Sequence, residues 1–584
     1  MQTNKTKIIA TLGPRCSTVD QMIQYIRAGM NVARINLSHG DRASHQKMID
    51  LVKTAREKLG TDTAILLDTR GPEIRVQQME EALTLPQGSS LILVDEDSET
   101  GQDRLGVNYP SIADDVKIGC KILLDDGKLQ LKVTDIQDGE VHTKVLVGGT
   151  VSSRKRVALP DMIVQLPSLS EKDEQDIAFG VTQEVDFIAA SFVRQADDVW
   201  AVRKIIEDGG GNQAIIAKIE NRQGVENLDE ILAAAEGLMV ARGDLGVEMP
   251  AEEVPVIQKR LIRAANLSGK PVITATQMLE SMIINPSPTR AEASDVTNAI
   301  FDGSDAVMLS AETAVGNNPL EAIHFLARCA QISEGSLDYE AILAEGLRYR
   351  RPVVTDSISY ACCATAADLE AAAIIATTMS GSTARMAARY RPKAPIIAVS
   401  SSQQTIRQLQ LIRGVTPISC AKATNMDDHL DRSIHAATQA KLVQNGDLVV
   451  ITAGLPIQTA GTTNMLKVHT VADICFTGQG IGTAMTDGEI RVIRTEEDWQ
   501  DLPKKVIVVV SATDHSMVDN LTRVRGVIAE QAGLTSHAAI LGRELGVPVI
   551  CNVTNATDQF ENGQTVTIDG STGQICYGSM RGRN

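Results

Sequence analysis

Residues 217–248 read AKIENRQGVENLDEILAAAEGLMVARGDLGVE, and this stretch decides the fold. An apolar run at its start and a second one at residues 238–240 each end abruptly in charged residues. Between these runs, residues 224–235 carry apolar side chains at helical spacing. The order strand, helix, strand predicts a parallel α/β unit with polar residues where its strands finish. In a parallel α/β barrel, the reactive groups gather at these carboxyl ends.

The charged residues at the two strand ends are suited to one shared site. Side chains alternate along a strand, so Lys218 and Glu220 point to the same face. Asp244 follows the second strand, and its carboxylate and that of Glu220 together suit a divalent cation that prefers oxygen ligands. The alternative is an ion-pair cluster on the surface, which would have no catalytic role.

Short apolar runs alternate with helical segments on both sides of this unit. Eight runs have the length of buried strands: residues 7–12, 31–37, 63–67, 185–190, 214–218, 237–240, 272–274 and 306–309. Eight is the number of strands in a (β/α)₈ TIM barrel, which is the fold class we predict. From residue 70 to residue 165 the segments are instead short and alternating, with Asp-Gly turns between them, and they predict an inserted small β-barrel lid.

The remaining residues complete the predicted domain organisation. A further α/β domain of three layers follows the barrel, then a Gly- and Thr-rich stretch that we interpret as a linker, then a small module. The predicted parts are the first part of the barrel (1–69), the lid (70–165), the second part of the barrel (166–338), the α/β domain (339–472), the linker (473–500) and the C-terminal module (501–584).

Composition narrows the class of protein. The 584-residue chain has a formal net charge of −17, which argues against a nucleic-acid-binding surface. Its nine cysteines are scattered without a CxxC pair, as in proteins of a reducing compartment. The sequence has no run of about 18 apolar residues, so no membrane-spanning helix is expected. We therefore expect a cytoplasmic enzyme that acts on small molecules.

Other polar residues stand at the ends of neighbouring strands. Arg34, Asn36 and Ser38 have the spacing that places all three on one side of a strand. A guanidinium such as that of Arg34 grips two oxygens of a phosphate or carboxylate. Asn36 and Ser38, with Asp68 and Thr69 from the next strand, form an all-oxygen set with one formal charge, which suits a monovalent cation. Each of these residues alone is more often a structural polar group.

The α/β domain contains a loop rich in hydroxyl groups at a strand-to-helix turn. Its candidate ligands for an anion are Thr378, Ser380, Ser382 and Thr383. Hydroxyls and backbone amides at such a turn bind phosphate groups. An ordinary helix capped by Ser or Thr explains the same residues equally well.

Several motifs closely resemble those of the pyruvate kinase family and occur in that family's order. They are NVARINLSHG (31–40), LLDTRGPEIR (66–75), AKIEN (217–221), MVARGDLGVE (239–248), TATQMLESM (274–282) and PTRAEASDVTNAIFDGSDAVMLSAETA (288–314). Residues 340–472 also resemble the family's C-terminal effector domain. The resemblance implies glycolytic phosphoryl transfer from phosphoenolpyruvate to ADP, giving pyruvate and ATP. It also implies a homotetramer that a phosphorylated metabolite activates.

The resemblance assigns roles around the substrate. Glu220 and Asp244 would hold Mg²⁺ or Mn²⁺, and Lys218 would neutralise the transferred phosphoryl group and the enolate. Thr276 would lie beside the enolate carbon and help to deliver its proton. The backbone around Gly243 and Asp244 would take the substrate carboxylate.

The resemblance also assigns the phosphate-binding and potassium-binding residues. Arg34 and Arg75 would bind phosphates, and Lys155 would lie on the nucleotide side. Glu73 is the residue that accompanies potassium dependence in the family. The expected K⁺ ligands are Asn36, Ser38, Asp68 and Thr69. The chain departs from the family's common residues at Arg70, Arg156 and Ala311, which bear on the nucleotide and on lid geometry.

The C-terminal module contains GLTSHAAILGRELGVPVI (533–550), which resembles the swivelling phosphohistidine domain of phosphoenolpyruvate-utilising enzymes. In those enzymes the histidine of this motif, here His537, carries a phosphoryl group. The chain has no recognisable ATP-grasp partner, so we favour a structural or regulatory role over active phosphotransfer.

Two alternatives for the function of the barrel remain. The first is a lyase that acts on an enolate without nucleotide, and the second is a catalytically silent metabolite sensor that uses residues 377–383.

Overall fold

The computed structural model describes residues 4–578 apart from short gaps. The gaps are residues 97, 99–100, 102, 161, 163, 423–424, 455–461, 472–473, 483, 501, 504–505, 513–519, 521, 532–539, 541 and 545. The chain divides into two compact units. The first contains residues up to 350 with 380–391 and 402–417, and the second contains residues 351–379, 392–401 and those from 418 onward.

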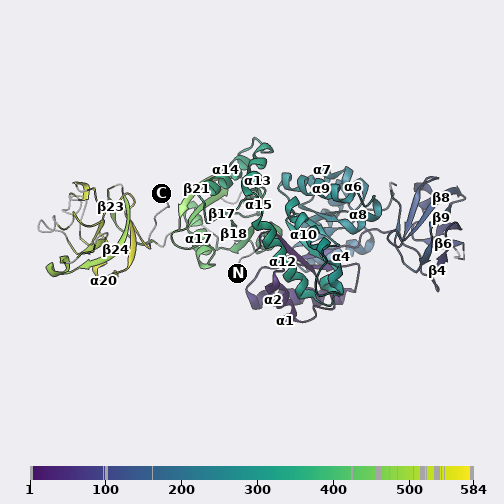
Figure 1. Cartoon of the computed structure of the whole chain (residues 1–584), viewed down its shortest axis with the longest axis horizontal. Helices are drawn as coiled ribbons and strands as arrows, with labels where there is room; N and C mark the ends of the chain where they lie inside the picture. The colour runs from purple at the N-terminus through teal and green to yellow at the C-terminus, as the bar shows by residue number, and fades with distance from the viewer. Residues whose placement is uncertain are drawn as a thin grey trace. The chain divides into compact units, whose positions relative to one another are not determined.

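The first unit is built on a closed barrel of eight parallel strands in the order β1-β16-β15-β14-β13-β12-β3-β2 (Figure 1). The strands are β1 (Lys7–Thr11), β2 (Val32–Asn36), β3 (Ala64–Asp68), β12 (Phe187–Ala190), β13 (Ala214–Ile219), β14 (Gly237–Ala241), β15 (Val272–Ala275) and β16 (Ala306–Leu309). The predicted TIM barrel is therefore confirmed. Its strands read as continuous apolar runs because both of their faces are buried. Ile8 packs in the layer between strands and helices, whereas Ile9 joins the cluster inside the barrel.

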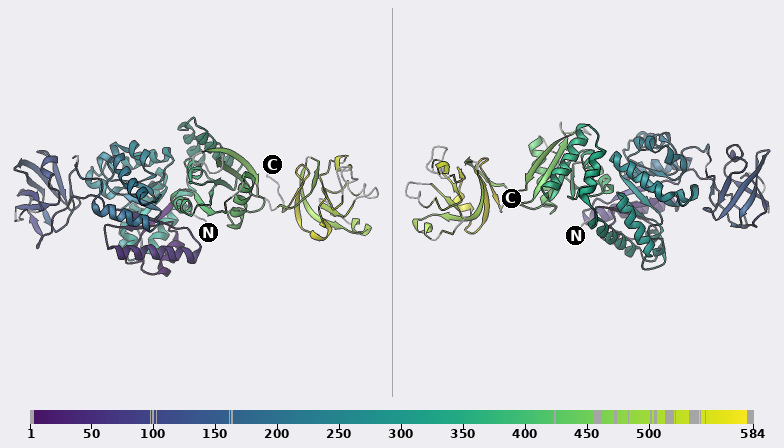
Figure 2. Two further views of the ribbon diagram at one scale, coloured as in Figure 1. Left: turned by 180° about the vertical axis from the view of Figure 1, so that it is seen from behind. Right: turned by 45° about the horizontal axis from the view of Figure 1, so that its top comes forward.

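Helices surround the barrel, as Figures 1 and 2 show. They are α1 (Val19–Ala28), α2 (Arg42–Leu59), α4 (Glu171–Thr182), α5 (Ala196–Asp208), α6 (Arg222–Glu226), α7 (Leu228–Ala234), α8 (Arg242–Glu248), α9 (Val254–Ser268), η1 (Glu280–Ile283), α10 (Arg290–Asp302), α11 (Ala311–Ala314) and α12 (Pro319–Gly335). Capping boxes at Thr18, Asp41, Ser170 and Thr289 start four of them. The helix expected at 224–235 is split at Asn227 into α6 and α7.

The insertion between β3 and α4 is all β apart from the short helix α3 (Ile112–Asp115). Its strands are β4 (Leu83–Leu85), β5 (Ser90–Asp95), β6 (Arg104–Val107), β7 (Lys121–Leu124), β8 (Leu129–Gln137), β9 (Glu140–Val147), β10 (Gly149–Val151) and β11 (Val157–Ala158). They form a six-stranded sheet, β11-β7-β8-β9-β5-β6, and the pair β10-β4. The two segments that connect the insertion to the barrel pair with each other, because Arg75 and Arg156 form an antiparallel bridge.

The α/β domain has a five-stranded sheet in the order β19-β18-β17-β20-β21. Its strands are β17 (Ala373–Thr377), β18 (Ile396–Ser400), β19 (Val415–Ser419), β20 (Leu448–Gly454) and β21 (Thr463–Thr470). In the second unit, α14 (Val354–Asp368) packs on β20 and β21, and α17 (Met426–Gln439) packs on β17 and β18 (Figure 2). The helices α13 (Tyr339–Arg348), α15 (Ser382–Ala388), α16 (Gln403–Gln408) and η2 (Leu409–Leu411) lie in the first unit.

The C-terminal module forms an eight-stranded sheet in the order β22-β29-β28-β24-β25-β26-β27-β23. The strands are β22 (Ile474–Thr477), β23 (Gln479–Ile481), β24 (Met485–Ile493), β25 (Val506–Val510), β26 (Gly526–Ala529), β27 (Val549–Cys551), β28 (Thr565–Asp569) and β29 (Gln574–Tyr577). The short helices η3 (Glu496–Trp499) and α20 (Ala556–Gln559) accompany it.

The interpretation of residues 473–500 as a linker is wrong, because β22, β23 and β24 belong to this sheet. The glycines in this stretch serve close packing of backbones. A side chain at Gly478 would lie 2.4 Å from the carbonyl oxygen of Cys551, and one at Gly480 would lie 2.5 Å from that of Gly570. Across the described residues of the whole chain, the helices are all too short or too polar to cross a membrane.

Candidate active site

Lys218 is held between three oxygen-bearing side chains at the carboxyl ends of the barrel strands. Its Nζ lies 3.1 Å from Oδ1 of Asp68, 2.9 Å from Oε1 of Glu220 and 2.7 Å from Oγ of Ser191. Burial opposes the charged form, but Asp68 and Glu220 together raise the pKa of Lys218 above its ordinary value. Lys218 therefore carries a full positive charge at neutral pH, as the sequence predicts for this strand end.

Arg34 is a second cation beside Asp68. Its Nε donates to Oδ2 of Asp68 over 2.7 Å, and its Nη1 donates to Oγ1 of Thr11 over 2.9 Å. Asp68 is 1% exposed. Burial favours its neutral form, but Lys218 and Arg34 lower the pKa of this carboxyl below its ordinary value. Asp68 therefore stays ionised and holds two cations at the rim of the barrel.

Glu220 is a buried carboxylate on which the charge of Asp244 acts. One of its oxygens accepts from the backbone amide of Phe192 over 2.5 Å. Burial raises the pKa of Glu220 to about 8, and the charge of Asp244 adds to this rise although Lys218 opposes it. A cation bound between Glu220 and Asp244 would relieve this repulsion, so the pair fits a metal ion.

The two carboxylates also match the ligand habits of Mg²⁺. This ion is commonly held by one or two carboxylates, with substrate oxygens and water completing the octahedron. In the part of the chain that the structure describes, His, Cys, Asp and Glu form no cluster of three or more that would enclose an ion completely. A site completed by substrate is the arrangement that Glu220 and Asp244 allow.

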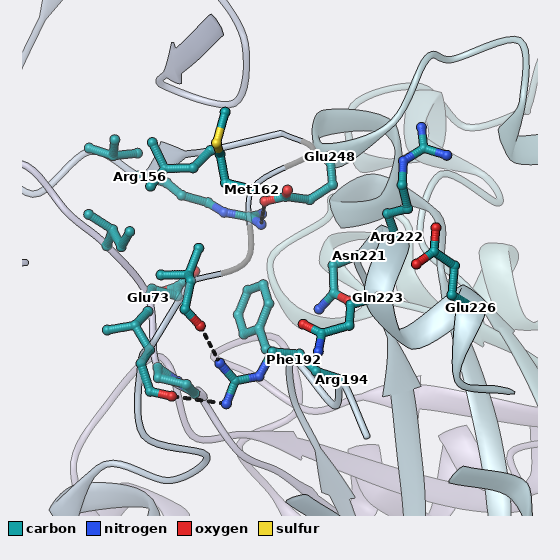
Figure 3. A pocket seen from close by; sticks show the side chains of 16 residues that line it. Glu73, Arg156, Met162, Phe192, Arg194, Asn221, Arg222, Gln223, Glu226 and Glu248 are labelled. Carbon is teal, nitrogen blue, oxygen red and sulfur yellow. Dashed lines mark hydrogen bonds and ion pairs between the residues drawn. The ribbon is translucent and has the colours of Figure 1, made fainter. Parts of the chain in front are cut away.

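Asp244 is paired with an arginine from the insertion. Nη1 of Arg156 lies 2.5 Å from Oδ1 of Asp244, and its Nη2 lies 3.4 Å from Oε1 of Glu248. The guanidinium also lies over the ring of Phe192, 5.0 Å from the ring centre. Figure 3 shows Arg156 close to Glu248, with Phe192 below them in the view. The insertion thus supplies a positive charge to one of the two expected metal ligands.

The cavity that Figure 3 shows has a volume of about 300 Å³. Glu73 and Arg156 of the insertion line it, together with residues that follow the strands of the barrel: Phe192, Arg194, Asn221, Arg222, Gln223, Glu226 and Glu248 (Figure 3). Arg194 donates to the backbone carbonyls of Val164 and Leu166, each over 3.0 Å. The cavity therefore opens beside the Lys218 cluster between the insertion and the start of α6.

Thr276 occupies a strained position directly after β15. Its φ angle is 65°, a region that residues other than glycine rarely adopt. Arg242 maintains this conformation, because it donates to the carbonyl of Thr276 over 2.5 Å and forms an ion pair of 2.6 Å with Asp295. The hydroxyl of Thr276 accepts from the backbone amide of Gly243 over 2.9 Å. The structure thus brings Thr276 and Gly243 together.

The expected K⁺ ligands also lie close to one another. Asn36 stands opposite Asp68 in the register of β2 and β3. Oδ1 of Asn36 accepts from the amide of Ser38 over 3.1 Å, and the carbonyl of Thr69 accepts from the hydroxyl of Ser191 over 2.7 Å. These oxygens come from adjacent strand ends, and each retains a lone pair for a cation.

Two residues expected at the nucleotide have partners within the insertion and its connections. Nζ of Lys155 lies 2.7 Å from Oδ1 of Asp125, so its side chain is used inside the insertion. Arg75 pairs with Glu73 over 2.5 Å. Arg70 lies 3.5 Å from the same carboxylate. The insertion residue that reaches the carboxylate cluster is Arg156 and not Lys155.

The expected effector loop follows β17. The amide of Thr378 donates to the carbonyl of Val399 over 2.9 Å, and α15 begins at Ser382 after Gly381, whose φ is 80°. Ser380 and Thr383 complete the loop, and Thr383 is 6% exposed. His537 lies in the segment 532–539, outside the described residues.

Sequence reasoning missed Ser191 and Phe192 and did not assign Arg156 to the site. Ser191 and Phe192 directly follow β12. The rule that identified Lys218, that polar residues at strand ends face the site, would have identified Ser191 as well. The side chain of Arg156 was recognisable only as a departure from the family's common residue.

Comparison with known proteins gives a consistent result over almost the whole chain. Residues 3–323 match a pyruvate kinase barrel domain, residues 356–469 a pyruvate kinase alpha/beta domain, and residues 502–573 the mobile domain of PEP-utilising enzymes. The pyruvate kinase of Geobacillus stearothermophilus is 49% identical over 579 residues, covering 98% of this chain and 99% of that protein. The pyruvate kinase of Sporosarcina psychrophila is 47% identical over 580 residues, covering 98% of this chain and 99% of that protein. The crystal structure of a pyruvate kinase from Cryptosporidium parvum superposes with a TM-score of 0.76 at 37% identity, covering 80% of this chain and 96% of that one.

Proposed function

This chain belongs to the pyruvate kinase family of phosphotransferases, and from this premise we propose that its barrel site uses Mg²⁺ and K⁺ to transfer the phosphoryl group of phosphoenolpyruvate to ADP. The observation that carries the proposal is the position of Lys218. Its charged Nζ lies within 3.1 Å of Asp68, Glu220 and Ser191, beside the pair Glu220 and Asp244. A fixed cation beside a two-carboxylate metal site is what phosphoryl transfer to a nucleotide requires.

Catalysis in this reaction rests on positioning and on neutralising charge. A divalent cation at Glu220 and Asp244 would draw charge from the carboxylate and enolate oxygens of the substrate. The charged Nζ of Lys218 lies beside the same two carboxylates. It would stabilise the phosphoryl group during transfer and the enolate oxygen from which that group departs. Arg34, which Asp68 holds by its Nε, keeps other N–H groups for a phosphate oxygen.

Pyruvate forms when the enolate carbon takes up a proton. Thr276 is the hydroxyl that we assign to this step, because it is fixed beside the amide of Gly243. The proton donor would be either the hydroxyl of Thr276 or a water molecule bound to that hydroxyl. In both cases Thr276 would place the donor at one face of the enolate. The amides around Gly243 and Asp244 lie at the start of α8 and would donate hydrogen bonds to the substrate carboxylate.

The monovalent cation would be bound by oxygens of Asn36, Ser38, Asp68 and Thr69. The register of Asn36 against Asp68 supports this assignment. Glu73 forms an ion pair with Arg75, which we assign to the nucleotide phosphates. Lys155 remains a weaker candidate on the nucleotide side, since Asp125 already binds it.

We further propose that a phosphorylated metabolite activates the enzyme through Thr378, Ser380, Ser382 and Thr383, and that the enzyme is a cytoplasmic homotetramer. The C-terminal module, with His537, would have a structural or regulatory role. These assignments follow the family and the hydroxyl content of the loop.

A coupled assay tests the reaction. Full-length protein is supplied with phosphoenolpyruvate, ADP and Mg²⁺, with K⁺ present and then omitted, and pyruvate is measured. Lys218→Met should lose about three orders of magnitude in kcat, because a charge that the transition state needs is gone. Lys204→Met removes an exposed lysine on α5 and should be unchanged. Pyruvate formation without ADP would instead favour the lyase, and an inactive wild type would favour the sensor.

A further inference from the structure

Thr11, the last residue of β1, carries a buried hydroxyl beside Arg34. The two residues are paired in the register of β1 and β2, so their side chains lie on the same face of the barrel wall. Thr11 is 4% exposed and Arg34 is 8% exposed. The neighbour of the cation that we assign to a phosphate is therefore a hydroxyl shielded from solvent.

The hydroxyl of Thr11 has two partners, and its single proton determines the direction of both hydrogen bonds. Oγ1 lies 2.8 Å from the carbonyl oxygen of Leu309 and 2.9 Å from Nη1 of Arg34. A carbonyl only accepts and a guanidinium only donates. The proton of Thr11 is therefore used on Leu309, and the lone pairs of its oxygen face Arg34.

Thr11 gives Arg34 a second point of attachment. Nε of Arg34 donates to Oδ2 of Asp68 over 2.7 Å, whereas the bond to Thr11 uses Nη1. With Asp68 alone, the planar guanidinium could rotate about the contact at Nε. Bonds at two nitrogens fix the plane, so the remaining N–H groups of Nη1 and Nη2 form a fork with a set direction. Such a fork is the arrangement that grips two oxygens of a phosphate.

The backbone of Thr11 is held as well. The hydroxyl of Thr313 donates to the carbonyl of Thr11 over 2.9 Å, and the phenol of Tyr25 donates to the carbonyl of Thr313 over 3.0 Å. A side chain at Gly13 would begin 2.5 Å from the carbonyl oxygen of Ala314, so the chain after β1 packs directly against α11. These contacts set the position of Thr11 when the protein folds and not when a ligand binds, which is how a site is preorganised.

Thr143 of β9 is a matched residue that has only the structural half of these contacts. It is 2% exposed, and its hydroxyl donates to the carbonyl of Leu91 over 2.7 Å, as that of Thr11 does to Leu309. Among the described residues, no cationic side chain forms a hydrogen bond with Thr143. Replacing either threonine by valine removes a buried hydrogen bond, but only at position 11 does an arginine lose its acceptor.

We propose that Thr11 is a positioning residue that directs the guanidinium of Arg34 onto the phosphoryl group of the substrate. This inference rests on the proposed function, in which Arg34 binds that phosphoryl group, and it adds the residue that sets the orientation. Thr11 acts through Arg34 and leaves its charge unchanged. Loss of the hydroxyl should therefore weaken ligands that carry a phosphoryl group and spare ligands that lack one.

Calorimetric titration of the full-length protein with Mn²⁺ present tests this selectivity. Phosphoglycolate carries a carboxylate and a phosphoryl group, whereas oxalate carries carboxylates alone. Thr11→Val should weaken phosphoglycolate binding about tenfold and leave oxalate binding within about twofold of the wild type. Thr11→Ser keeps the hydroxyl and should restore most of the affinity. Thr143→Val should bind both ligands as the wild type does.

A double variant shows whether the effect passes through Arg34. In protein that already carries Arg34→Gln, adding Thr11→Val should not change phosphoglycolate affinity further, because the group that Thr11 orients is gone. In the coupled assay, Thr11→Val alone should raise the KM for phosphoenolpyruvate about tenfold and lower kcat less, since the phosphoryl charge is present before and during transfer. Thr11→Ala provides the same tests if Thr11→Val does not fold.

Three results would overturn the positioning role. They are unchanged phosphoglycolate affinity in Thr11→Val, an equal loss of affinity for phosphoglycolate and oxalate, and an undiminished effect of Thr11→Val in the Arg34→Gln protein. Because binding is measured without turnover, failure of the proposed function is distinguishable. A wild type that binds phosphoglycolate but forms no pyruvate would overturn the function and leave the role of Thr11 to be decided by the titrations.

Discussion

The guanidinium of Arg156 lies 2.5 Å from the carboxylate of Asp244. Arg156 comes from the insertion and Asp244 from the first turn of α8, so this ion pair joins the lid to the expected metal site. The same guanidinium contacts Glu248 and the ring of Phe192. Arg156 therefore offers Asp244 the same kind of positive charge that a divalent cation would offer it.

Arg156→Gly should strengthen metal binding in the protein without substrate. Asp244 would no longer have to release a guanidinium before it binds a cation, so the affinity for Mn²⁺ should rise about tenfold, equivalent to about 1.4 kcal/mol. Calorimetry or electron paramagnetic resonance of Mn²⁺ measures this. Arg154→Gly removes the same charge two residues earlier and should change little. Equal Mn²⁺ affinity in Arg156→Gly and wild type would show that the pair does not compete with metal.

Ser191→Ala should slow catalysis with little effect on substrate affinity. Ser191 accepts from Nζ of Lys218 and donates to the carbonyl of Thr69, each over 2.7 Å, so it orients both the lysine that we propose as catalytic and an expected K⁺ ligand. We expect kcat to fall about tenfold and the K⁺ concentration for half activity to rise, because a lost hydrogen bond to a charged group costs about 1.5–3 kcal/mol. Ser336→Ala, at an exposed helix end, is the control. A normal K⁺ requirement would contradict the proposed orientation of Thr69.

Asp186→Asn should destabilise the barrel strongly. Asp186 is fully buried and lies 3.1 Å from Arg56 and 2.6 Å from Arg407. Without its charge two guanidinium groups lose their counterion, which typically costs about 3–5 kcal/mol. Urea unfolding measures the change. Glu345→Gln breaks the exposed pair with Arg263 and should cost below about 1 kcal/mol. Similar costs for both variants would mean that burial of Asp186 does not determine the effect.

Lys7 should make stability depend on pH above neutrality. Burial lowers the pKa of Lys7 from 10.5 to about 8 in the folded protein. Between these values the unfolded chain binds more protons than the folded one, so stability rises with pH. Below about pH 8 Lys7 is protonated in both the folded and the unfolded chain, so the free-energy cost of burying its charge does not vary with pH.

Lys7→Met removes this titration. At neutral pH the Lys7→Met variant should have a higher free energy of unfolding than the wild type. This difference should shrink by about 3 kcal/mol as the pH rises from about 8 to 10.5. Urea unfolding at a series of pH values measures this difference. For the control variant Lys204→Met, the difference from the wild type should be the same at every pH. A difference between Lys7→Met and wild type that does not vary with pH would contradict the titration of Lys7.

The barrel and its carboxylate site were predictable because they follow from local pattern. Buried parallel strands give short apolar runs, and the rule of strand ends then brings Lys218, Glu220 and Asp244 together. The contact of Arg156 depends on how the insertion meets the barrel, which no periodicity encodes. Lys155 shows the same limit, since it precedes β11 and is bound by Asp125, which follows the paired strand β7.

Composition was misleading where glycine has a packing role. Gly478 and Gly480 belong to the stretch whose composition predicts a linker, but both lie where two backbones approach closely in the C-terminal sheet. Sequence composition alone does not distinguish the two uses of glycine, because each requires only the absence of a Cβ.

The bridge between Arg75 and Arg156 joins the two segments that carry the insertion. A nucleotide phosphate on Arg75 and a cation on Asp244 would therefore act on the same short piece of backbone. Coupling between two ligands is reciprocal, so whatever factor the metal contributes to nucleotide affinity, the nucleotide must contribute to metal affinity. The paired segments would thus make the insertion a thermodynamic link between the two proposed ligands, and the strength of the link would be the ratio of Mn²⁺ dissociation constants with and without ADP.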